Sequence, residues 1–209
     1  VGVAFYVMLA LRSYLREQNY FVTQNINEPN IAQLLDLVAL GTVADVVSLD
    51  GNNRILVEQG LKRIRAGQTR PGIQALIEVA NKNQQRLVAS DFGFALGPRI
   101  NAAGRLDDMS YGINCLLAPD LASARVMALE LDDLNKTRRE IEQGMQLEAE
   151  RVFKSLSLNE ERFNESNLPS AIALYQQDWH QGVIGIVAGR LKEKFHRPCI
   201  VFAQGKEDE

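Results

Sequence analysis

The sequence has few of the residues that usually build metal and redox sites. Its 209 residues include only two histidines, His180 and His196, and two cysteines, Cys115 and Cys199. The cysteines lie far apart among apolar neighbours and form no CxxC pair, which excludes the common zinc and dithiol motifs. We expect both to be small buried residues of a reducing compartment, and therefore a cytoplasmic protein.

Signatures of several enzyme classes and of membrane insertion are also missing. The sequence has no Gly-x-Ser-x-Gly elbow, no Walker loop and no His-Glu-x-x-His motif. Its opening apolar run, residues 1–11, is shorter than the roughly 20 residues that span a bilayer. The run also lacks the charged front and cleavage site of a signal peptide. Because both ends interrupt apolar segments, we expect an internal fragment of a longer protein.

The formal net charge of −3 does not by itself favour nucleic-acid binding. Local clusters matter more than the total, however, and positive charge is concentrated in a few places. The clusters lie at residues 62–70, at Arg99 and Arg105, at residues 136–139 and at residues 190–197. The sequence is therefore compatible with an anionic binding partner.

Apolar periodicity and capping residues predict a mainly helical chain that ends in an α/β segment. Helices are predicted over residues 3–18, 31–40, 54–65, 72–80, 111–117, 121–156 and 183–195, and strands over 171–175 and 198–203. The order strand, loop, helix, strand is typical of an α/β domain with a parallel or mixed sheet. The helix over 121–156 would be about 50 Å long and is expected to join two lobes. A plain core helix with a solvated charged face is the alternative.

Residues 93–108 combine two arginines and an amide, Arg99, Arg105 and Asn101, with glycine and alanine. Arginine offers planar, bidentate donors suited to phosphate, and small residues let a ligand approach the backbone. This pattern favours a surface for an anionic ligand, because nothing bulky is present to pack. The alternative is an ordinary polar loop with a turn at Gly97 and Pro98.

Asp45 is a carboxylate among apolar residues, where burial is costly unless the group is paired, capping or bound to a metal. It is interpreted either as a helix cap or salt-bridge partner, or as a ligand of Mg²⁺ or Mn²⁺. Asp36 is the nearest further carboxylate and a weaker candidate. One aspartate alone makes no metal site.

His180 lies between the predicted strand and helix, where α/β sheets bind anions at a helix N-terminus. The glycines at 182, 185 and 189 fall within the predicted helix instead of the turn before it. We therefore interpret them as close helix–sheet packing and not as a dinucleotide site. His196 follows the same helix and is expected to cap it or to be solvated.

Four blocks of the sequence resemble, in order and spacing, the single-stranded-DNA-specific 5′→3′ exonucleases of the DHH phosphoesterase superfamily. The blocks are residues 35–49, 96–106, 131–139 and 179–198. The resemblance implies an α/β protein with three parts: the C-terminal part of a DHH catalytic core (1–119), a long connector helix (120–157) and the truncated start of a DHH-associated nucleic-acid-binding domain (168–209). It also implies two-metal hydrolysis of phosphodiesters with Mg²⁺ or Mn²⁺ in DNA repair and recombination.

The same resemblance assigns roles to individual residues. Asp45 matches a metal ligand of the family, and Arg99, Asn101 and Arg105 match its phosphate-holding motif. His180 and Arg190 match positions that face the DNA channel. The family's Asp-His-His and Gly-Gly-His motifs are absent from the sequence. We therefore expect the isolated chain to bind metal poorly and to be inactive.

Two further readings of the resemblance stay open. One is a sister phosphodiesterase that acts on short oligonucleotides or cyclic dinucleotides. The other is a catalytically dead relative that binds DNA as a replication scaffold, which would have no reason to keep the carboxylate of Asp45. For the exonuclease, the expected partners are single-stranded DNA, a helicase and a single-strand-binding protein.

Overall fold

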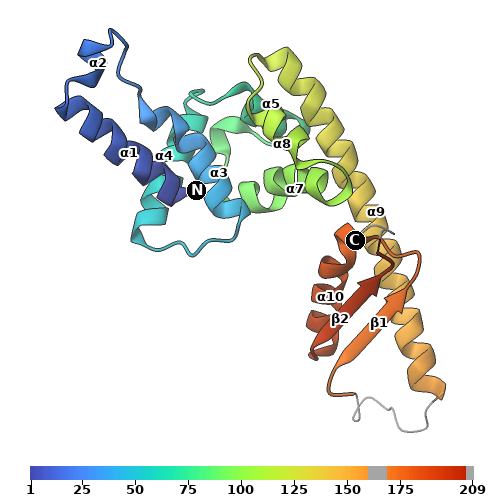
Figure 1. The fold of residues 1–209 in the computed structure, drawn as a ribbon. Helices are drawn as coiled ribbons and strands as arrows, with labels where there is room; N and C mark the ends of the chain where they lie inside the picture. The colour runs from blue at the N-terminus through green and yellow to red at the C-terminus, as the bar shows by residue number, and fades with distance from the viewer. Residues whose placement is uncertain (160–168, 206–209) are drawn as a thin grey trace. The chain divides into compact units, whose positions relative to one another are not determined.

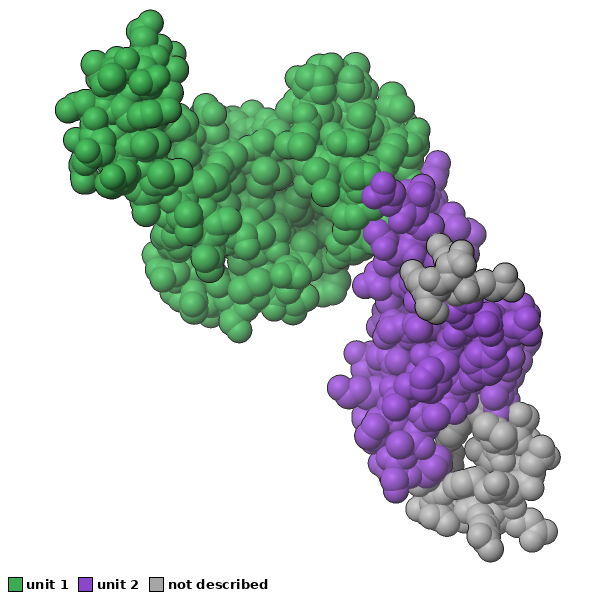
Figure 2. All heavy atoms as spheres, in the orientation of Figure 1, with its two compact units in different colours: residues 1–103, 109–132 green, residues 104–108, 133–209 purple. Residues whose placement is uncertain are grey.

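The computed structural model of the chain describes residues 1–159 and 169–205 (Figure 1). The chain divides into two compact units, drawn in green and purple in Figure 2. Unit 1 comprises residues 1–103 and 109–132, and unit 2 comprises residues 104–108 and 133–209. Residue 168 and residues 206–209 of the expected third part, 168–209, lie outside the described residues.

Unit 1 contains helices and connecting segments but no strand among its described residues, and the predicted helices are present with shifted ends. Its elements are α1 (Gly2–Glu17), α2 (Tyr20–Thr23), the 3₁₀ turn η1 (Ile31–Leu34), α3 (Leu35–Ala44), α4 (Gly51–Arg65), α5 (Pro71–Val79), the 3₁₀ turn η2 (Gln84–Arg86), α6 (Ala89–Asp91), the π-helical turn η3 (Phe92–Leu96), α7 (Gly97–Leu106), α8 (Met109–Leu116) and α9 (Leu121–Asn159). Helices α7 and α9 each contribute their later residues to unit 2.

The core of unit 1 forms around α3, which packs closely against α4. Gly60 on α4 makes this packing possible, because a Cβ there would lie 2.3 Å from the carbonyl oxygen of Leu35 and 2.4 Å from the Cβ of Ala39. Ile64, one turn after Gly60, is fully buried. The two helices therefore touch backbone to backbone, which fixes the direction of α3.

Unit 2 contains the predicted strand, helix, strand segment, as β1 (Ile172–Gln176), α10 (Gln181–Phe195) and β2 (Cys199–Ala203). The strands are parallel, with Ile172 opposite Cys199. One core joins the strands to α10 and the later part of α9, and includes Trp179, Val187 and Met145. The expectation of an α/β segment is confirmed. No helix in the described part of the chain is long and apolar enough to cross a membrane.

Four helices of unit 1 end in the same way, with a residue in the left-handed region just past the helix. This residue is Asn25 after α2, Gly67 after α4, Asn81 after α5 and Val46 after α3. In each case its N–H and the next N–H donate back to carbonyls of the last turn, which is the Schellman pattern. Glycine and asparagine tolerate this conformation, whereas a β-branched residue is strained there.

The end of α3 is therefore held at a strained residue. Val46 has φ 55° and a side chain that is 89% exposed, so packing does not compensate the strain. The sequence predicts that this helix ends at Gly41. That prediction is wrong, because Gly41 is helical and the left-handed position falls five residues later, directly after Asp45.

Val46→Gly is expected to raise the free energy of unfolding by about 1 kcal/mol. Left-handed backbone costs a side-chain-bearing residue about 1–2 kcal/mol, and the greater chain entropy of glycine offsets part of the gain. Equilibrium urea unfolding measures the change in the free energy of unfolding. The matched control is Gly67→Val at the same position of α4, where no atom lies within 4 Å of the added Cβ. Gly67→Val should lower the free energy of unfolding. An equal change of this free energy in Gly67→Val and Val46→Gly would contradict the strain assigned to Val46.

Candidate functional site

Asp45 is the C-cap residue of α3, and its side chain is exposed. Its carboxylate makes no hydrogen bond or ion pair with any residue that the structure describes, so neither the N-cap nor the salt-bridge interpretation holds. A negative charge at a helix C-terminus is disfavoured by about 0.3–1 kcal/mol, because the partial charge there is also negative. The fold of unit 1 thus gives this carboxylate no stabilising role, and its oxygens are free for a hard cation.

Asp45 and Asn101 line one pocket of about 350 Å³ in unit 1. The rest of its wall is apolar or small and includes Leu40, Ala44 and Gly97. Gly97 begins α7 directly against the end of α3, where an added Cβ would lie 2.9 Å from the Cβ of Ala44. This contact brings together two of the residues that the sequence singled out, although 56 positions separate them along the chain.

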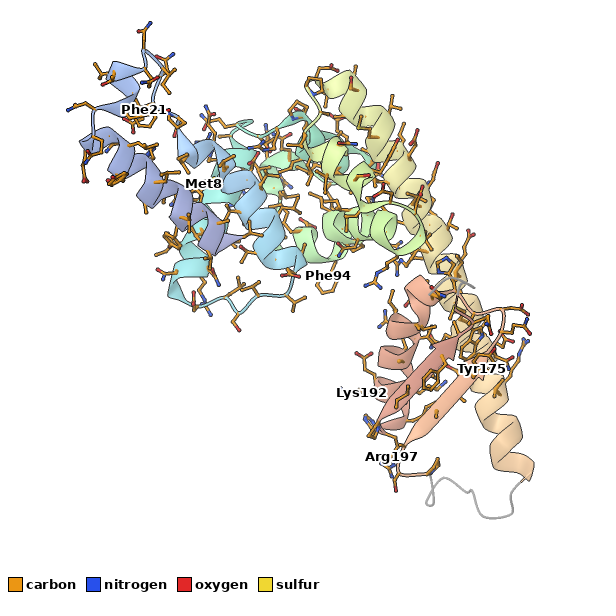
Figure 3. All side chains as sticks on the ribbon, in the orientation of Figure 1. Met8, Phe21, Phe94, Tyr175, Lys192 and Arg197 are labelled. Atoms are coloured by element: carbon orange, nitrogen blue, oxygen red, sulfur yellow. The ribbon has the colours of Figure 1, made fainter. Side chains whose placement is uncertain are left out.

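The segment 93–108 is mainly helical, so the alternative of an ordinary polar loop is wrong. Most of it is the helix α7, preceded by the π-helical turn η3. Its small residues are packed: Ala102 and Ala103 are fully buried. These two alanines therefore serve close helix packing, whereas Asn101, Gly104 and Arg105 on the same helix are exposed. Phe94 has an exposed side chain that projects from η3 (Figure 3).

Arg99 points into unit 1 and is engaged there. Its Nε and Nη2 lie 2.8 Å from one carboxylate oxygen of Asp132 on α9, and its Nη1 donates to the carbonyl of Ala95 at 2.6 Å. Only 12% of the side chain is exposed. The guanidinium therefore ties the start of α7 to α9, and it differs in this respect from the exposed Asn101 and Arg105.

Arg105 and His180 lie close together in unit 2, at the N-terminus of α10. His180 is the N-cap, and its Nδ1 accepts the N–H of Gly182 at 3.1 Å. Arg105 donates from Nη1 to the carbonyl of Gly182, also at 3.1 Å. Both side chains are exposed. The predicted position of His180 before a helix N-terminus is confirmed.

The three glycines of α10 do not share one role. A Cβ at Gly182 would lie 1.9 Å from the carbonyl oxygen of Arg105, so this glycine packs against the end of α7. Gly185 and Gly189 have no described atom within 4 Å of an added Cβ. The interpretation of all three as helix–sheet packing is therefore wrong.

Arg190 lies on α10 beside a buried carboxylate of α9. Its Nε is 3.3 Å from Glu142, which also pairs with Arg138 one turn earlier on α9. Glu142 is 9% exposed, whereas the side chain of Arg190 is 55% exposed. Burial lowers the pKa of Arg138, and the Glu142 carboxylate opposes that shift. Glu142 thus anchors the guanidinium of Arg190 and leaves part of it open to solvent.

The described residues do not form a complete metal site. Within residues 1–159 and 169–205, no three His, Cys, Asp or Glu side chains are grouped to hold an ion. Asp36 is excluded as a partner of Asp45, because it lies at the other end of α3 and is bonded to Thr69 and Arg70. Asp45 can supply one hard oxygen ligand, and the others would have to come from elsewhere.

Comparison with known proteins gives close relatives, although no family model matches the chain. It is 63% identical over 203 residues to the single-stranded-DNA-specific exonuclease RecJ of Escherichia coli, across 97% of this chain and 34% of that protein. The crystal structure of Thermus thermophilus RecJ in complex with Mg²⁺ matches with a TM-score of 0.70 at 34% identity, across 88% of this chain and 27% of that one. The corresponding Mn²⁺ complex matches with a TM-score of 0.69 at 34% identity, across 88% and 26% of the two chains. The chain thus spans about a third of the length of the relatives it matches.

Proposed function

The chain is similar in sequence and in fold to a segment of RecJ, and we propose that it works as part of a single-stranded-DNA-specific 5′→3′ exonuclease. The observation that carries this proposal is the 63% identity to RecJ across 97% of the chain. The proposed reaction is hydrolysis of phosphodiester bonds in DNA repair and recombination. The resemblance stated from the four sequence blocks is confirmed by the relatives and by the fold.

We propose that Asp45 is one ligand of a site for Mg²⁺ or Mn²⁺. The relevant support is chemical: its carboxylate is exposed, has no partner in the described residues and lies at the unfavourable end of α3. Metal ions at such a site would activate water and stabilise the leaving oxygen of a phosphodiester. Asn101 lines the same pocket, and we propose that it donates its amide N–H to a phosphate oxygen.

The proposed DNA contacts divide into two kinds. Arg105, His180 and Arg190 are exposed and offer donors to phosphate oxygens, while Gly182 and Glu142 hold them in place. Arg99 is proposed as a phosphate contact as well, but its guanidinium would have to be shared with Asp132. Its removal would therefore weaken both DNA binding and the packing of α7 on α9.

The remaining proposals rest on the resemblance to RecJ and concern domain organisation, location and partners. We propose that residues 1–119 belong to the catalytic core, 120–157 to a connector and 168–209 to the start of a DHH-associated domain. The proposed location is the cytoplasm, and the proposed partners are single-stranded DNA, a helicase and a single-strand-binding protein. We propose that the isolated chain is inactive, because it supplies only part of the metal site.

The test is a substrate panel for the full-length protein that contains this chain. Single-stranded DNA labelled at either end, duplex DNA and a cyclic dinucleotide are incubated with Mg²⁺ or Mn²⁺. Release of the label as a mononucleotide at the first time point, from the 5′-labelled single strand only, is the expected result. Preferential cleavage of the cyclic dinucleotide would favour the sister phosphodiesterase. Binding of DNA without any hydrolysis would favour the scaffold, and either result would contradict the proposal.

A further inference from the structure

A second pocket of unit 1 lies away from Asp45, at the opposite end of α3. It has a volume of about 590 Å³ and is lined by residues before α3, at the end of α4 and before α5. The helix geometry puts Asp36, which lines this pocket, about 13 Å along α3 from Asp45. Arg63 and Arg70 line it as well, so it contains part of the basic cluster at residues 62–70.

The acidic residue of this pocket is already neutralised by its own neighbours. Asp36 is 1% exposed, and its carboxylate accepts from the Thr69 hydroxyl at 3.1 Å, the Arg70 N–H at 3.0 Å and the Arg70 Nε at 3.2 Å. It thus fixes the start of α5 and holds the Arg70 guanidinium. These bonds leave the positive charge of Arg63 uncompensated at the pocket.

Arg63 is the unexplained group of this pocket. Its Nε is buried and has no hydrogen-bond partner among the described residues. The nearby carboxylate on α4, Glu58, pairs with Lys62 instead, at 3.6 Å. A buried donor without a partner costs about 1–3 kcal/mol. A guanidinium in this state is suited to bind an oxyanion from outside the chain.

We propose that this pocket binds a phosphate group, with Arg63 as its main ligand and Arg70 as the second. Gln68 and Asn30 also line the pocket and offer amide donors. We assign this phosphate to the DNA strand, and that assignment rests on the proposed exonuclease function. A free phosphate or nucleotide is the other source of the same chemistry.

The first experiment probes the pocket with inorganic phosphate and does not depend on DNA. Thermal unfolding of the full-length protein is compared with and without phosphate, for the parent, Arg63→Gln and Lys62→Gln. Lys62 is the matched control, because this residue directly before Arg63 carries the same charge but does not line the pocket. Phosphate should raise the melting temperature of the parent and of Lys62→Gln, and raise that of Arg63→Gln clearly less.

The second experiment measures binding of single-stranded DNA in EDTA across a salt series. One lost phosphate contact should make the slope of log K against log salt shallower by about 0.7 for Arg63→Gln, with no change for Lys62→Gln. If Arg63→Gln unfolds, Arg63→Lys keeps the charge without the planar fork and should lose part of both effects. If phosphate raises the melting temperature but Arg63→Gln leaves the salt slope of DNA binding unchanged, the ligand of the pocket is a free phosphate and not the DNA strand. Equal responses of Arg63→Gln and Lys62→Gln in both experiments would overturn the site, whereas failure of the parent to bind DNA would overturn the proposed function alone.

Discussion

Asp45→Asn in the full-length protein is expected to lower the rate of single-strand hydrolysis by at least about 10³-fold. A catalytic metal supplies several kcal/mol of transition-state stabilisation, and each 1.4 kcal/mol corresponds to a factor of ten. Folding should not suffer, because removing a negative charge from the C-terminus of α3 is worth about 0.3–1 kcal/mol in favour of the fold. Single-turnover cleavage assays and urea unfolding measure the two effects.

The matched control is Asp50→Asn, five residues further along the chain. Asp50 caps α4 by accepting the N–H of Asn53 at 2.8 Å, and asparagine caps a helix equally well. This variant should keep full activity. Normal cleavage by Asp45→Asn would remove Asp45 from the metal site. So would a fall in its free energy of unfolding large enough to account for the lost activity.

Gly182→Ala is expected to destabilise unit 2 by about 3 kcal/mol, at the upper end of the usual cost of overpacking. The added Cβ would meet the carbonyl oxygen of Arg105 at 1.9 Å, and a backbone carbonyl in a helix cannot move aside as a flexible side chain can. The displacement would also break the hydrogen bond from Arg105 to Gly182. Equilibrium urea unfolding gives the stability change, and DNA affinity gives the effect on Arg105.

Gly185→Ala, one turn later on α10, provides the comparison. Nothing described lies within 4 Å of its Cβ, so alanine should stabilise the helix by about 0.5–1 kcal/mol. The two substitutions are chemically identical and differ only in what the methyl group meets. If they shift the unfolding midpoint in the same direction, the approach of Gly182 to the Arg105 carbonyl does not decide the cost of the added methyl group.

The ends of helices show how far the sequence could predict this fold. The end of α4 was predictable, because Gly67 occupies its left-handed position. The end of α3 was not, because Val46 occupies the corresponding position and carries no local signal for it. The close contacts of α3 with Gly60 on α4 and of Ala44 with Gly97 join residues far apart in the sequence and give no local signal either. The strained residue is adjacent to the proposed metal ligand, as is common at functional sites.

For the candidate site, the sequence named residue types but could not give their contacts. Arginine, asparagine and aspartate in a pattern shared with nucleases indicated Asp45, Asn101 and Arg105. That Arg99 turns inward could not be read from the sequence, because its partner Asp132 is 33 positions away. The same holds for Arg63: the sequence shows a basic cluster, and only the fold shows which cation of it lacks a partner.

The most direct test of the account is the manganese content of the full-length protein after dialysis, compared between the parent and Asp45→Asn. Two-metal hydrolysis predicts about two Mn²⁺ per molecule for the parent. It predicts a lower content or a weaker affinity for Asp45→Asn, at unchanged folding. Equal stoichiometry and equal affinity of the two proteins would contradict the claim that this chain contributes a ligand to the catalytic metal site.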